Sequence, residues 1–374
     1  MTMSDITTVC AADGIVSGVT PKAKKSYFYR PELDCLRFFA FMAVFVHHTM
    51  PRSIEFYSNH HLPTALSNVA NAGAFGVDLF FCLSAYLITE LLLREKEEVG
   101  HLNVKAFYIR RILRIWPLYF AFLLFGFALT FVDPTQHFSA AQLTMFLLLA
   151  GNWASAITVI NSVVAPLWSI SVEEQFYLFW PLVVRKATRR QIFIVCLAMV
   201  SVAFIWRAFV QMRMYSHDLA WNATFGHLDS MAYGILLALM GIRKHTAVGA
   251  RIGYFCGGLS AWYVAGGIHD RDDTVMALAA LGSVLILRSV TGAKLDNVVL
   301  VRLGIVSYGL YVYHELFLVT FNRILPSSHG MGFVLWWLLS LTATVITALA
   351  SYRVLESPFL KLKERFAVVK SRPV

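Results

Sequence analysis

Two adjacent carboxylates, Glu173 and Glu174, stand in the apolar and aromatic stretch LWSISVEEQFYLFWP at residues 167–181. A second apolar stretch ends in a histidine, His48, and carries Arg37 eleven residues earlier. A histidine and a carboxylate are the side chains that general acid/base catalysis uses, with the histidine as base and the carboxylate orienting it. The elements that hold both stretches must therefore bring His48 close to one of the two glutamates.

Composition predicts that those elements lie in a membrane. The 374 residues are 58% hydrophobic and only 14% charged, against about 25% charged in soluble domains. Apolar blocks recur at about the 20-residue length of a membrane span. We therefore predict an all-α, polytopic membrane protein with a transmembrane domain at 31–360, between tails at 1–30 and 361–374. Its ten expected spans are 36–51, 73–93, 115–132, 166–184, 191–210, 224–242, 251–268, 274–290, 304–322 and 332–351. The apolar block 143–153 is too short to cross, so we expect an interfacial or re-entrant segment over the outer end of the next helix.

Charge distribution predicts the orientation. Of the 32 Lys and Arg residues, all but five fall on one side of this layout, as the positive-inside rule requires of the cytoplasmic side. Both termini are then cytoplasmic, and the protein belongs in the cell (inner or plasma) membrane. The same pattern explains the net charge of +10 without nucleic-acid binding. The first 26 residues lack the apolar region of a secretory signal and predict a retained cytoplasmic leader. The five scattered cysteines predict neither a disulfide framework nor a metal site.

Ionisable residues inside spans are costly and mark candidate sites. At 1.5 Å per residue, His48 lies about 16 Å from Arg37 and so in the outer half of the bilayer. Its neighbour His47 points about 100° away around the helix. We expect Glu173 at a depth similar to that of His48, with Asp229 and His314 contributed by other helices. These groups predict a polar cavity that faces outward, which could serve an enzyme or a transporter, although a single membrane histidine can also simply bond a neighbouring helix.

A basic patch precedes the third expected span in KAFYIRRILRIWPLYF. Arg110, Arg111 and Arg114 are three or four residues apart, so a helix presents them together. Guanidinium groups in such a cluster suit phosphate recognition, although topogenic charge and anionic lipid binding would also explain them. Arg37 could pair with Asp34, bind donor phosphates, or serve only as topogenic charge.

Several motifs occur together in a fixed order. They are LDCLRFFAFMAVFVHH, FGVDLFFCLSAYLIT, FYIRRILRIWPLYF, LWSISVEEQFY, HLDSMAYGILLA, SYGLYVYHELF and LESPF, and they extend over residues 30–360. In order and spacing this set resembles the acyltransferase-3 family of integral membrane acyltransferases. One departure is His227, which stands where many relatives have Arg and leaves the roles of His227 and Asp229 open.

The resemblance implies transfer of an acyl group, acetyl by family habit, from cytoplasmic acyl-CoA to a hydroxyl of a glycan or related acceptor at the outer side. Acyl-CoA is then a co-substrate, with no bound cofactor or metal, and the partners are a saccharide or lipid-linked saccharide and membrane lipids. His48 would act as base or transient acyl carrier, with Glu173 as supporting acid. The expected donor-binding residues are Arg37, Arg110, Arg111 and Arg114, and the supporting residues are Trp168, Ser171, Gln175, Asp229, Tyr308 and His314. The chain resembles a stand-alone member without a fused SGNH domain.

A transporter or flippase of a lipid-linked saccharide is the alternative, because the same intramembrane acids could relay protons. Against it, the sequence lacks a pair of Gly/Pro-broken helices in matching halves, the usual indicator of a transporter site.

Overall fold

The computed structural model describes residues 29–241, 246–268, 271–325 and 330–366, so the expected leader lies largely outside the described residues. Within these ranges the chain is helical, with one isolated bridge between His137 and Asn161 in place of any sheet. Ten longer helices coincide with the ten expected segments: α1 (Pro31–Thr49), α4 (Gly76–Val99), α5 (Val104–Leu129), α8 (Trp168–Lys186), α9 (Arg189–Met212), α11 (Leu228–Met240), α12 (Val248–Gly266), α13 (Asp272–Val290), α15 (Ser307–Ile324) and α16 (Gly330–Ser351).

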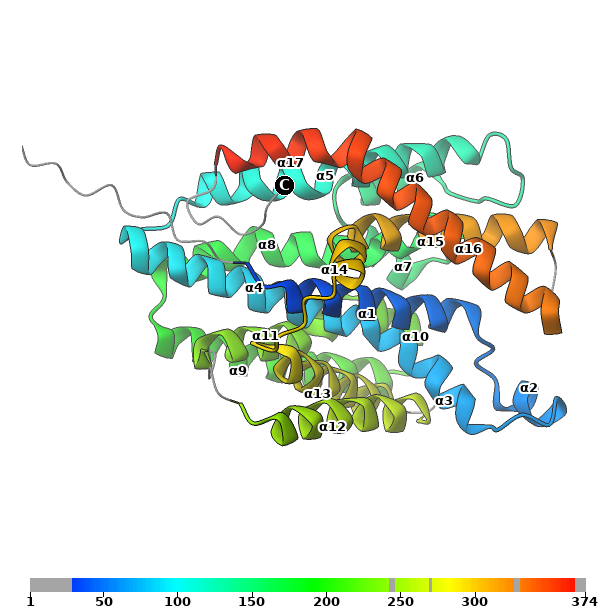
Figure 1. The fold of residues 1–374 in the computed structure, drawn as a ribbon, viewed down its shortest axis with the longest axis horizontal. Helices are drawn as coiled ribbons and strands as arrows, with labels where there is room; N and C mark the ends of the chain where they lie inside the picture. The colour runs from blue at the N-terminus through cyan, green and yellow to red at the C-terminus, as the bar shows by residue number, and fades with distance from the viewer. Residues whose placement is uncertain (1–28, 242–245, 269–270, 326–329, 367–374) are drawn as a thin grey trace, which may run out of the picture.

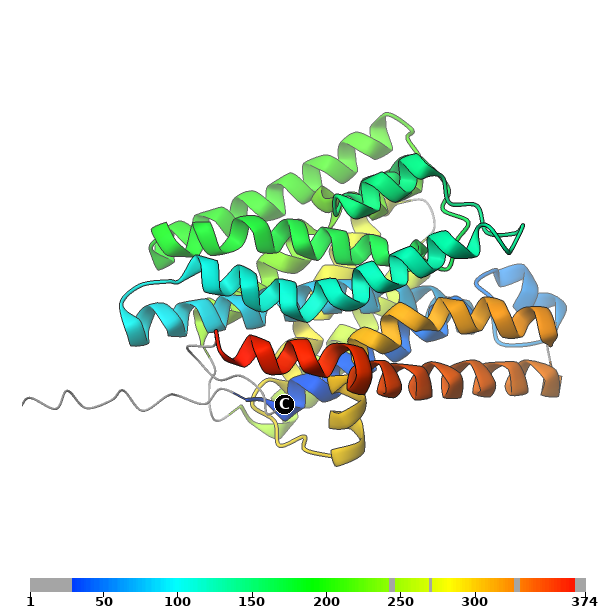
Figure 2. The same ribbon diagram turned by 90° about the horizontal axis from the view of Figure 1, so that it is seen from above.

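Shorter helices connect or cover these ten. They are α2 (Ile54–Asn59), α3 (Ala65–Ala72), α6 (Ala140–Leu147), α7 (Gly151–Ile157), α10 (His217–Asn222), α14 (Val298–Ile305) and α17 (Ser357–Glu364). Three 3₁₀ turns, η1 (Gly73–Phe75), η2 (Ala165–Leu167) and η3 (Thr224–His227), and a π-helical turn, η4 (Tyr352–Glu356), complete the set. The long helices run roughly along one axis of the molecule (Figures 1 and 2). In Figure 1, α12 and α13 lie on one side of α1 and α4, and α5 and α17 lie on the other.

The fold is that of an all-α polytopic membrane protein. Among the described residues, five helical stretches are long and apolar enough to cross a membrane, and a sixth is obtained if α14 and α15, bent by 72°, count as one span. The predicted count of ten is larger because it includes helices such as α1 and α8, which carry charged side chains. A membrane helix that faces protein rather than lipid can hold such groups. A test based on mean hydropathy and charge therefore does not count these helices as spans.

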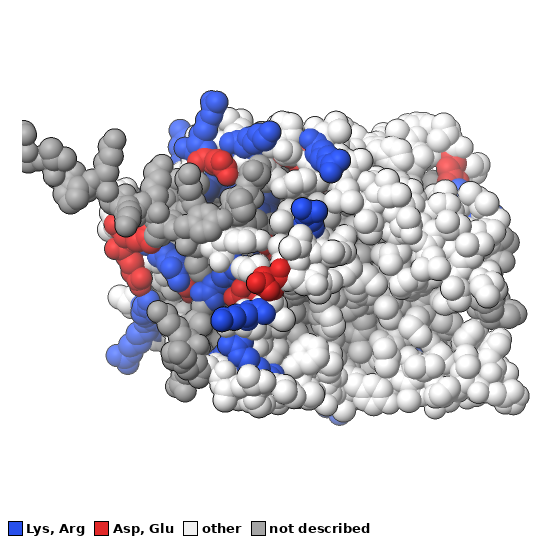
Figure 3. Space-filling model, viewed as in Figure 1, with Lys and Arg blue, Asp and Glu red and all other residues white. Residues whose placement is uncertain are grey.

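Charged side chains gather at one end of the molecule (Figure 3), where α4 ends and α5 begins. The rest of the face drawn there is almost free of Lys, Arg, Asp and Glu. This is the asymmetry on which the predicted orientation rests, because the positive-inside rule predicts that the charged end is cytoplasmic. We call it the inner end, and the opposite end, where α1 finishes, the outer end.

The apolar block at 143–153 forms no span. It falls on α6 and α7, which have eight and seven residues and are joined at Leu149, whose φ is 57°. Gln175 of α8 donates a hydrogen bond to Leu149 O at 2.9 Å and another to Asn152 Oδ1 at 2.8 Å. The block therefore packs against α8, the next long helix, and its interfacial or re-entrant position stays a prediction.

Close backbone contacts fix α4 among its neighbours. A Cβ at Gly76 of α4 would lie 2.4 Å from Ala40 O of α1, and one at Gly234 of α11 would lie 2.1 Å from Cys82 O of α4. Only glycine allows backbones to approach this closely, a device common between membrane helices. Both contacts hold α1 and α11 against the helix that lines the site described next.

Candidate active site

Three of the predicted donor-binding arginines line one cavity, which we call the inner pocket. Arg37 comes from α1, and Arg111 and Arg114 from α5. The pocket has a volume of about 150 Å³ and is formed by α1, α4, α5, α8 and α15. Its other polar lining residues include Arg30, Asp34, Ser84, Ser169, Glu173, Tyr177, Tyr308 and Tyr311.

The three arginines differ in how far they are already engaged. Arg37 Nη1 lies 2.5 Å from Asp34 Oδ1, the pairing considered from the sequence. The Arg111 guanidinium lies 5.3 Å from the centre of the Tyr177 ring, a cation–π contact. Within the described part of the chain, Arg111 Nε has no hydrogen-bond partner and neither Arg111 nor Arg114 forms an ion pair with a carboxylate. Their charges are therefore available to an anion in the pocket.

Arg110 lies elsewhere. Its guanidinium donates to Glu95 Oε2 at 3.0 Å and to Phe366 O at 2.7 Å, and it does not line the inner pocket. On α5 it faces Glu95 of α4 and Phe366, just after α17. The helical spacing correctly predicted a basic patch, but Arg110 is held away from the pocket by a carboxylate that the spacing could not reveal.

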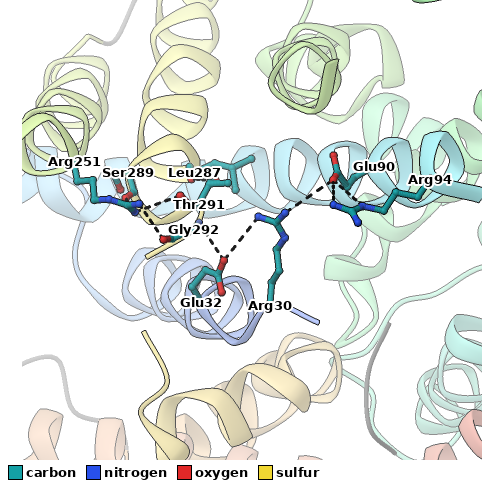
Figure 4. Close-up of polar contacts among 9 residues, drawn as sticks. All are labelled: Arg30, Glu32, Glu90, Arg94, Arg251, Leu287, Ser289, Thr291 and Gly292. Atoms are coloured by element: carbon teal, nitrogen blue, oxygen red, sulfur yellow. Dashed lines mark hydrogen bonds and ion pairs between the residues drawn. The ribbon is translucent and has the colours of Figure 1, made fainter. Parts of the chain in front are cut away.

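Arg30 stands where the inner pocket meets a polar network at the inner end (Figure 4). Its guanidinium lies 4.0 Å from Glu32 and 4.0 Å from Glu90, and Glu90 also accepts hydrogen bonds from Arg94. Glu32 accepts from Gly292 N at 3.1 Å. Beside it, Arg251 donates to the carbonyl oxygens of Ser289, Thr291 and Gly292 at the end of α13. The network ties α1, α4, α12 and α13 together around this end of the pocket.

Glu173 belongs to the inner pocket. Its carboxylate accepts a hydrogen bond from Ser84 of α4 at 2.9 Å and another from Tyr177 at 2.8 Å. Tyr308, also predicted as a supporting residue, lines the same pocket and donates to Ile115 O at 2.8 Å. Glu174 points away and accepts from Trp116 Nε1 at 2.9 Å, so the two adjacent glutamates have separate surroundings.

His48 lines a second cavity, the outer pocket, with a volume of about 550 Å³. It lies at the outer end of α1, one residue before the helix ends. The lining residues are His48, Arg52, Ala165, Pro166, Trp168, Glu315, Leu318, Val319, Asn322 and Trp336. His47 points elsewhere, with Nδ1 2.9 Å from Ala70 O, as the helical rotation predicted. Two indole rings, one arginine and one amide surround His48 in this pocket.

A histidine pair anchors His48. His48 Nδ1 lies 2.8 Å from Nε2 of His314, and His314 Nδ1 lies 2.6 Å from Tyr311 O. Glu315 Oε2 lies 3.5 Å from His48 Nδ1. His314 was predicted as a supporting residue from its position in the span. Glu315 was missed, although an acidic residue inside an apolar run is itself a signal.

A narrow wall separates the two pockets. Ser169 and Tyr311 line the inner pocket, while Pro166 and Trp168 line the outer one. The Tyr311 hydroxyl lies 2.8 Å from Ser169 Oγ and 3.1 Å from Pro166 O. Because Tyr311 also supplies the carbonyl bonded to His314, this wall adjoins the histidine pair. Ser169, Tyr177 and Tyr311 were not predicted from the sequence.

Glu173 and His48, which both belong to the described residues, do not make the expected contact, since they line different pockets. His48 is the second-last residue of α1, whereas Glu173 is the sixth of α8, about 7.5 Å inward of Trp168 at ~1.5 Å per residue. Counting from expected span ends placed them at one depth. The carboxylate nearest His48 in the outer pocket is instead Glu315.

Four predicted supporting residues line neither pocket: His314, which contacts His48, and Ser171, Gln175 and Asp229. Gln175 holds the α6–α7 connection, and Ser171 is fully buried. Asp229 is buried in an ion pair with Arg207 of α9. Beside it, His227 Nδ1 lies 2.9 Å from Asp78 Oδ1. These polar groups join α4, α9 and α11, and breaking a buried pair of this kind is strongly destabilising.

The family follows from a direct comparison. The model of the acyltransferase-3 family, described as an acyltransferase domain, matches residues 30–353. The chain belongs to this family. It is 26% identical over 377 residues to "Acyltransferase MdmB" of Streptomyces mycarofaciens, covering 92% of this chain and 95% of that one.

Two other bacterial relatives carry more specific names. "Putative O-acetyltransferase SAS0844" of Staphylococcus aureus (strain MSSA476) is 24% identical over 372 residues, covering 90% of this chain. "Putative peptidoglycan O-acetyltransferase YrhL" of Bacillus subtilis (strain 168) is 32% identical over 164 residues, covering 41% of this chain and 23% of its own length. The chain spans 58% of the length of the staphylococcal relative. No solved structure matches.

Proposed function

We propose that the protein is a membrane O-acyltransferase that moves an acyl group, acetyl being favoured, from cytoplasmic acyl-CoA to a hydroxyl of a glycan or related acceptor at the outer side of the cell membrane. Membership of the acyltransferase-3 family supports the reaction class. The observation that carries the proposal is the pairing of two cavities: an arginine-lined inner pocket and a histidine-bearing outer pocket, separated by the Ser169–Tyr311 wall.

The inner pocket suits the donor. Acyl-CoA carries phosphate groups, for which guanidinium is the preferred partner because its planar fork matches phosphate oxygens. Arg111 and Arg114 supply two such groups, and Arg37, held by Asp34, supplies a third. The apolar part of the lining, which includes Leu33, Phe80 and Ile88, suits a pantetheine arm directed toward Ser169 and Tyr311.

The outer pocket suits the acceptor. Trp168 and Trp336 offer aromatic faces on which a sugar ring can pack, and Arg52 and Asn322 offer hydrogen-bond donors. His48 stands among them as the general base. The names of the staphylococcal and Bacillus relatives support the transfer of an acetyl group to an oxygen atom of the acceptor.

The proposed reaction transfers the acyl group from the thioester of acyl-CoA to the acceptor hydroxyl. His48 takes the proton of the acceptor hydroxyl as its oxygen attacks the thioester carbonyl carbon. The new C–O bond forms, the C–S bond breaks, and the CoA thiolate receives the proton from His48. The acceptor leaves as an ester and CoA leaves as a thiol, so no metal or bound cofactor is consumed. A direct transfer uses fewer steps than an acyl-histidine relay and is the mechanism we test.

The test compares two neighbouring histidines. Purified protein in lipid nanodiscs is mixed with acetyl-CoA and with envelope glycan from a strain lacking the gene, and CoA release and glycan acetylation are measured. The His48→Ala variant should lose at least about 100-fold in kcat, a typical contribution of a general base. His47→Ala is the neighbouring control, because His47 Nδ1 faces Ala70 O and not the outer pocket, and its kcat should remain near wild type. A His48→Ala protein that acetylates at the wild-type rate would refute the assignment.

A further inference from the structure

The hydrogen bonds around His48 determine which of its ring nitrogens is the base. A carbonyl oxygen only accepts hydrogen bonds, so the 2.6 Å contact with Tyr311 O places a proton on His314 Nδ1. In a neutral imidazole the other nitrogen, His314 Nε2, then carries the lone pair. That nitrogen lies 2.8 Å from His48 Nδ1, so His48 Nδ1 must be the donor. The lone pair of His48 is therefore on Nε2, the ring nitrogen left for the outer pocket.

His314 cannot also balance the charge that forms during transfer. When His48 Nε2 takes a proton, the ring becomes a cation, and neutral His314 supplies only a dipole. A histidine base is commonly supported by a carboxylate on its opposite nitrogen. Glu173, predicted for that role from the sequence, lines the other pocket.

Glu315 is placed to supply the charge. Its Oε2 lies 3.5 Å from His48 Nδ1, and it lines the outer pocket on the same helix as His314. Among the described residues, the other charged or titratable groups at this site are His47 on α1 and Arg52, whose Nη1 donates a hydrogen bond to His47 Nε2 at 3.3 Å. Arg52 is cationic, so it opposes rather than stabilises a second positive charge on His48.

Resting on the proposed function, we infer that Glu315 is the positioning and charge-balancing carboxylate of His48, with His314 fixing the tautomer. Glu315 keeps its charge throughout, and neither gains nor loses a proton in the transfer. It stabilises the His48 cation that exists between proton removal from the hydroxyl and proton delivery to the thiolate.

A metal site is the competing interpretation of the same cluster. The ligand atoms of His48, His314 and Glu315 all lie within 4.8 Å of one another. Two histidine nitrogens bound to one zinc ion at ~2.0–2.1 Å in tetrahedral geometry are about 3.3 Å apart. The observed 2.8 Å is shorter and is typical of a hydrogen bond. The spacing therefore favours a proton between the rings over an ion.

The experiment measures kcat and the KM for acetyl-CoA in the nanodisc assay. Glu315→Gln keeps the shape and an acceptor oxygen but removes the charge, so a merely structural role would leave kcat unchanged. We expect kcat to fall at least about tenfold, as the loss of a unit charge next to a forming cation predicts, with the donor KM unchanged. Glu315→Asp, which keeps the charge, should retain more activity than Glu315→Gln. Glu55→Gln, an exposed carboxylate on α2, is the matched control and should match wild type.

The outcomes separate the two proposals. A wild-type kcat in Glu315→Gln overturns the role of Glu315 and leaves the proposed function intact. A wild-type protein that releases no CoA overturns the proposed function, and the role of Glu315 falls with it. Activity that is lost on treatment with EDTA and restored by Zn²⁺ also overturns the inference, in favour of a metal. Unchanged activity in EDTA, together with the kcat loss in Glu315→Gln, supports it.

Discussion

The hydroxyl of Tyr311 lies 2.8 Å from Ser169 Oγ and 3.1 Å from Pro166 O, and so joins α15 to the beginning of α8 between the inner and outer pockets. On the proposed function, the acyl chain must pass this point to reach His48. The contact must therefore open during each turnover, and its strength sets how often the pockets communicate.

Tyr311→Phe should open the wall more often. Phenylalanine fills nearly the same space but loses the hydroxyl, and a lost hydrogen bond of about 1 kcal/mol raises the open population about fivefold. Water then reaches the thioester more easily, so acetyl-CoA hydrolysis without acceptor should increase by a similar factor. Tyr313→Phe is the control, because the Tyr313 hydroxyl bonds Ser351 on the other side of α15. Equal hydrolysis rates in wild type and Tyr311→Phe would contradict the idea.

Arg111→Ala and Arg114→Ala should each raise the KM for acetyl-CoA. Both line the inner pocket, and a hydrogen bond to a charged group contributes about 1.5–3 kcal/mol, which corresponds to a roughly 10- to 100-fold weaker donor interaction. Arg110→Ala provides the comparison, since Arg110 is occupied by Glu95 and Phe366 O. Initial rates over a range of acetyl-CoA concentrations measure the effect. An unchanged donor KM would leave Arg111 and Arg114 as topogenic charges.

Much of the fold was predictable, because each long helix is an apolar block bounded by charges. The short block at 143–153 was also recognised, since its length alone excludes a span. The site was predictable only in part. Motif order singled out His48 in the outer pocket, its neighbour His314, and Arg37, Arg111 and Arg114 in the inner pocket. The sequence gives neither the depth at which α8 begins nor the partner of Arg110, and the catalytic roles of these residues stay predictions. Glu315, adjacent to His314, was missed because the choice of carboxylate depends on how α1 and α15 face each other.

Glu173→Gln should reduce activity far more than Glu174→Gln. Glu173 lines the donor pocket and accepts from Ser84 and Tyr177, so loss of its charge alters the surroundings of Arg37 and Arg111 and should appear mainly in the donor KM. Glu174 lies outside both pockets, and glutamine retains an oxygen to accept from Trp116. Steady-state kinetics of the two purified variants, with protein amounts matched by blotting, make the comparison. A larger loss in Glu174→Gln would reverse the assignment.

We expect the thermal stability of the protein to depend on pH through His217, which lies on the short helix α10. His217 on α10 donates to Asp272 at 2.8 Å, and this hydrogen bond raises the pKa of His217 above its usual value, against the opposing effect of burial. A raised pKa means that folding favours the protonated form. The stabilisation is therefore fully present below the ordinary histidine pKa of about 6.5 and is lost as the pH rises through the folded value. His217→Ala should lower the Tm at pH 5.5 and have less effect at pH 8.5.

The matched control for this pH effect is Asp133→Asn. The Asp133 carboxylate accepts from Arg323 at 2.6 Å, which lowers its pKa, so the stabilisation is present above the ordinary aspartate pKa of about 3.9 and lost only in more acidic solution. Asp133 remains ionised at both test pH values, and Asp133→Asn should shift the Tm equally at each. Thermal unfolding of the purified proteins in one detergent at both pH values measures the difference. A His217→Ala effect that is the same at pH 5.5 and 8.5 would show that the ion pair does not contribute.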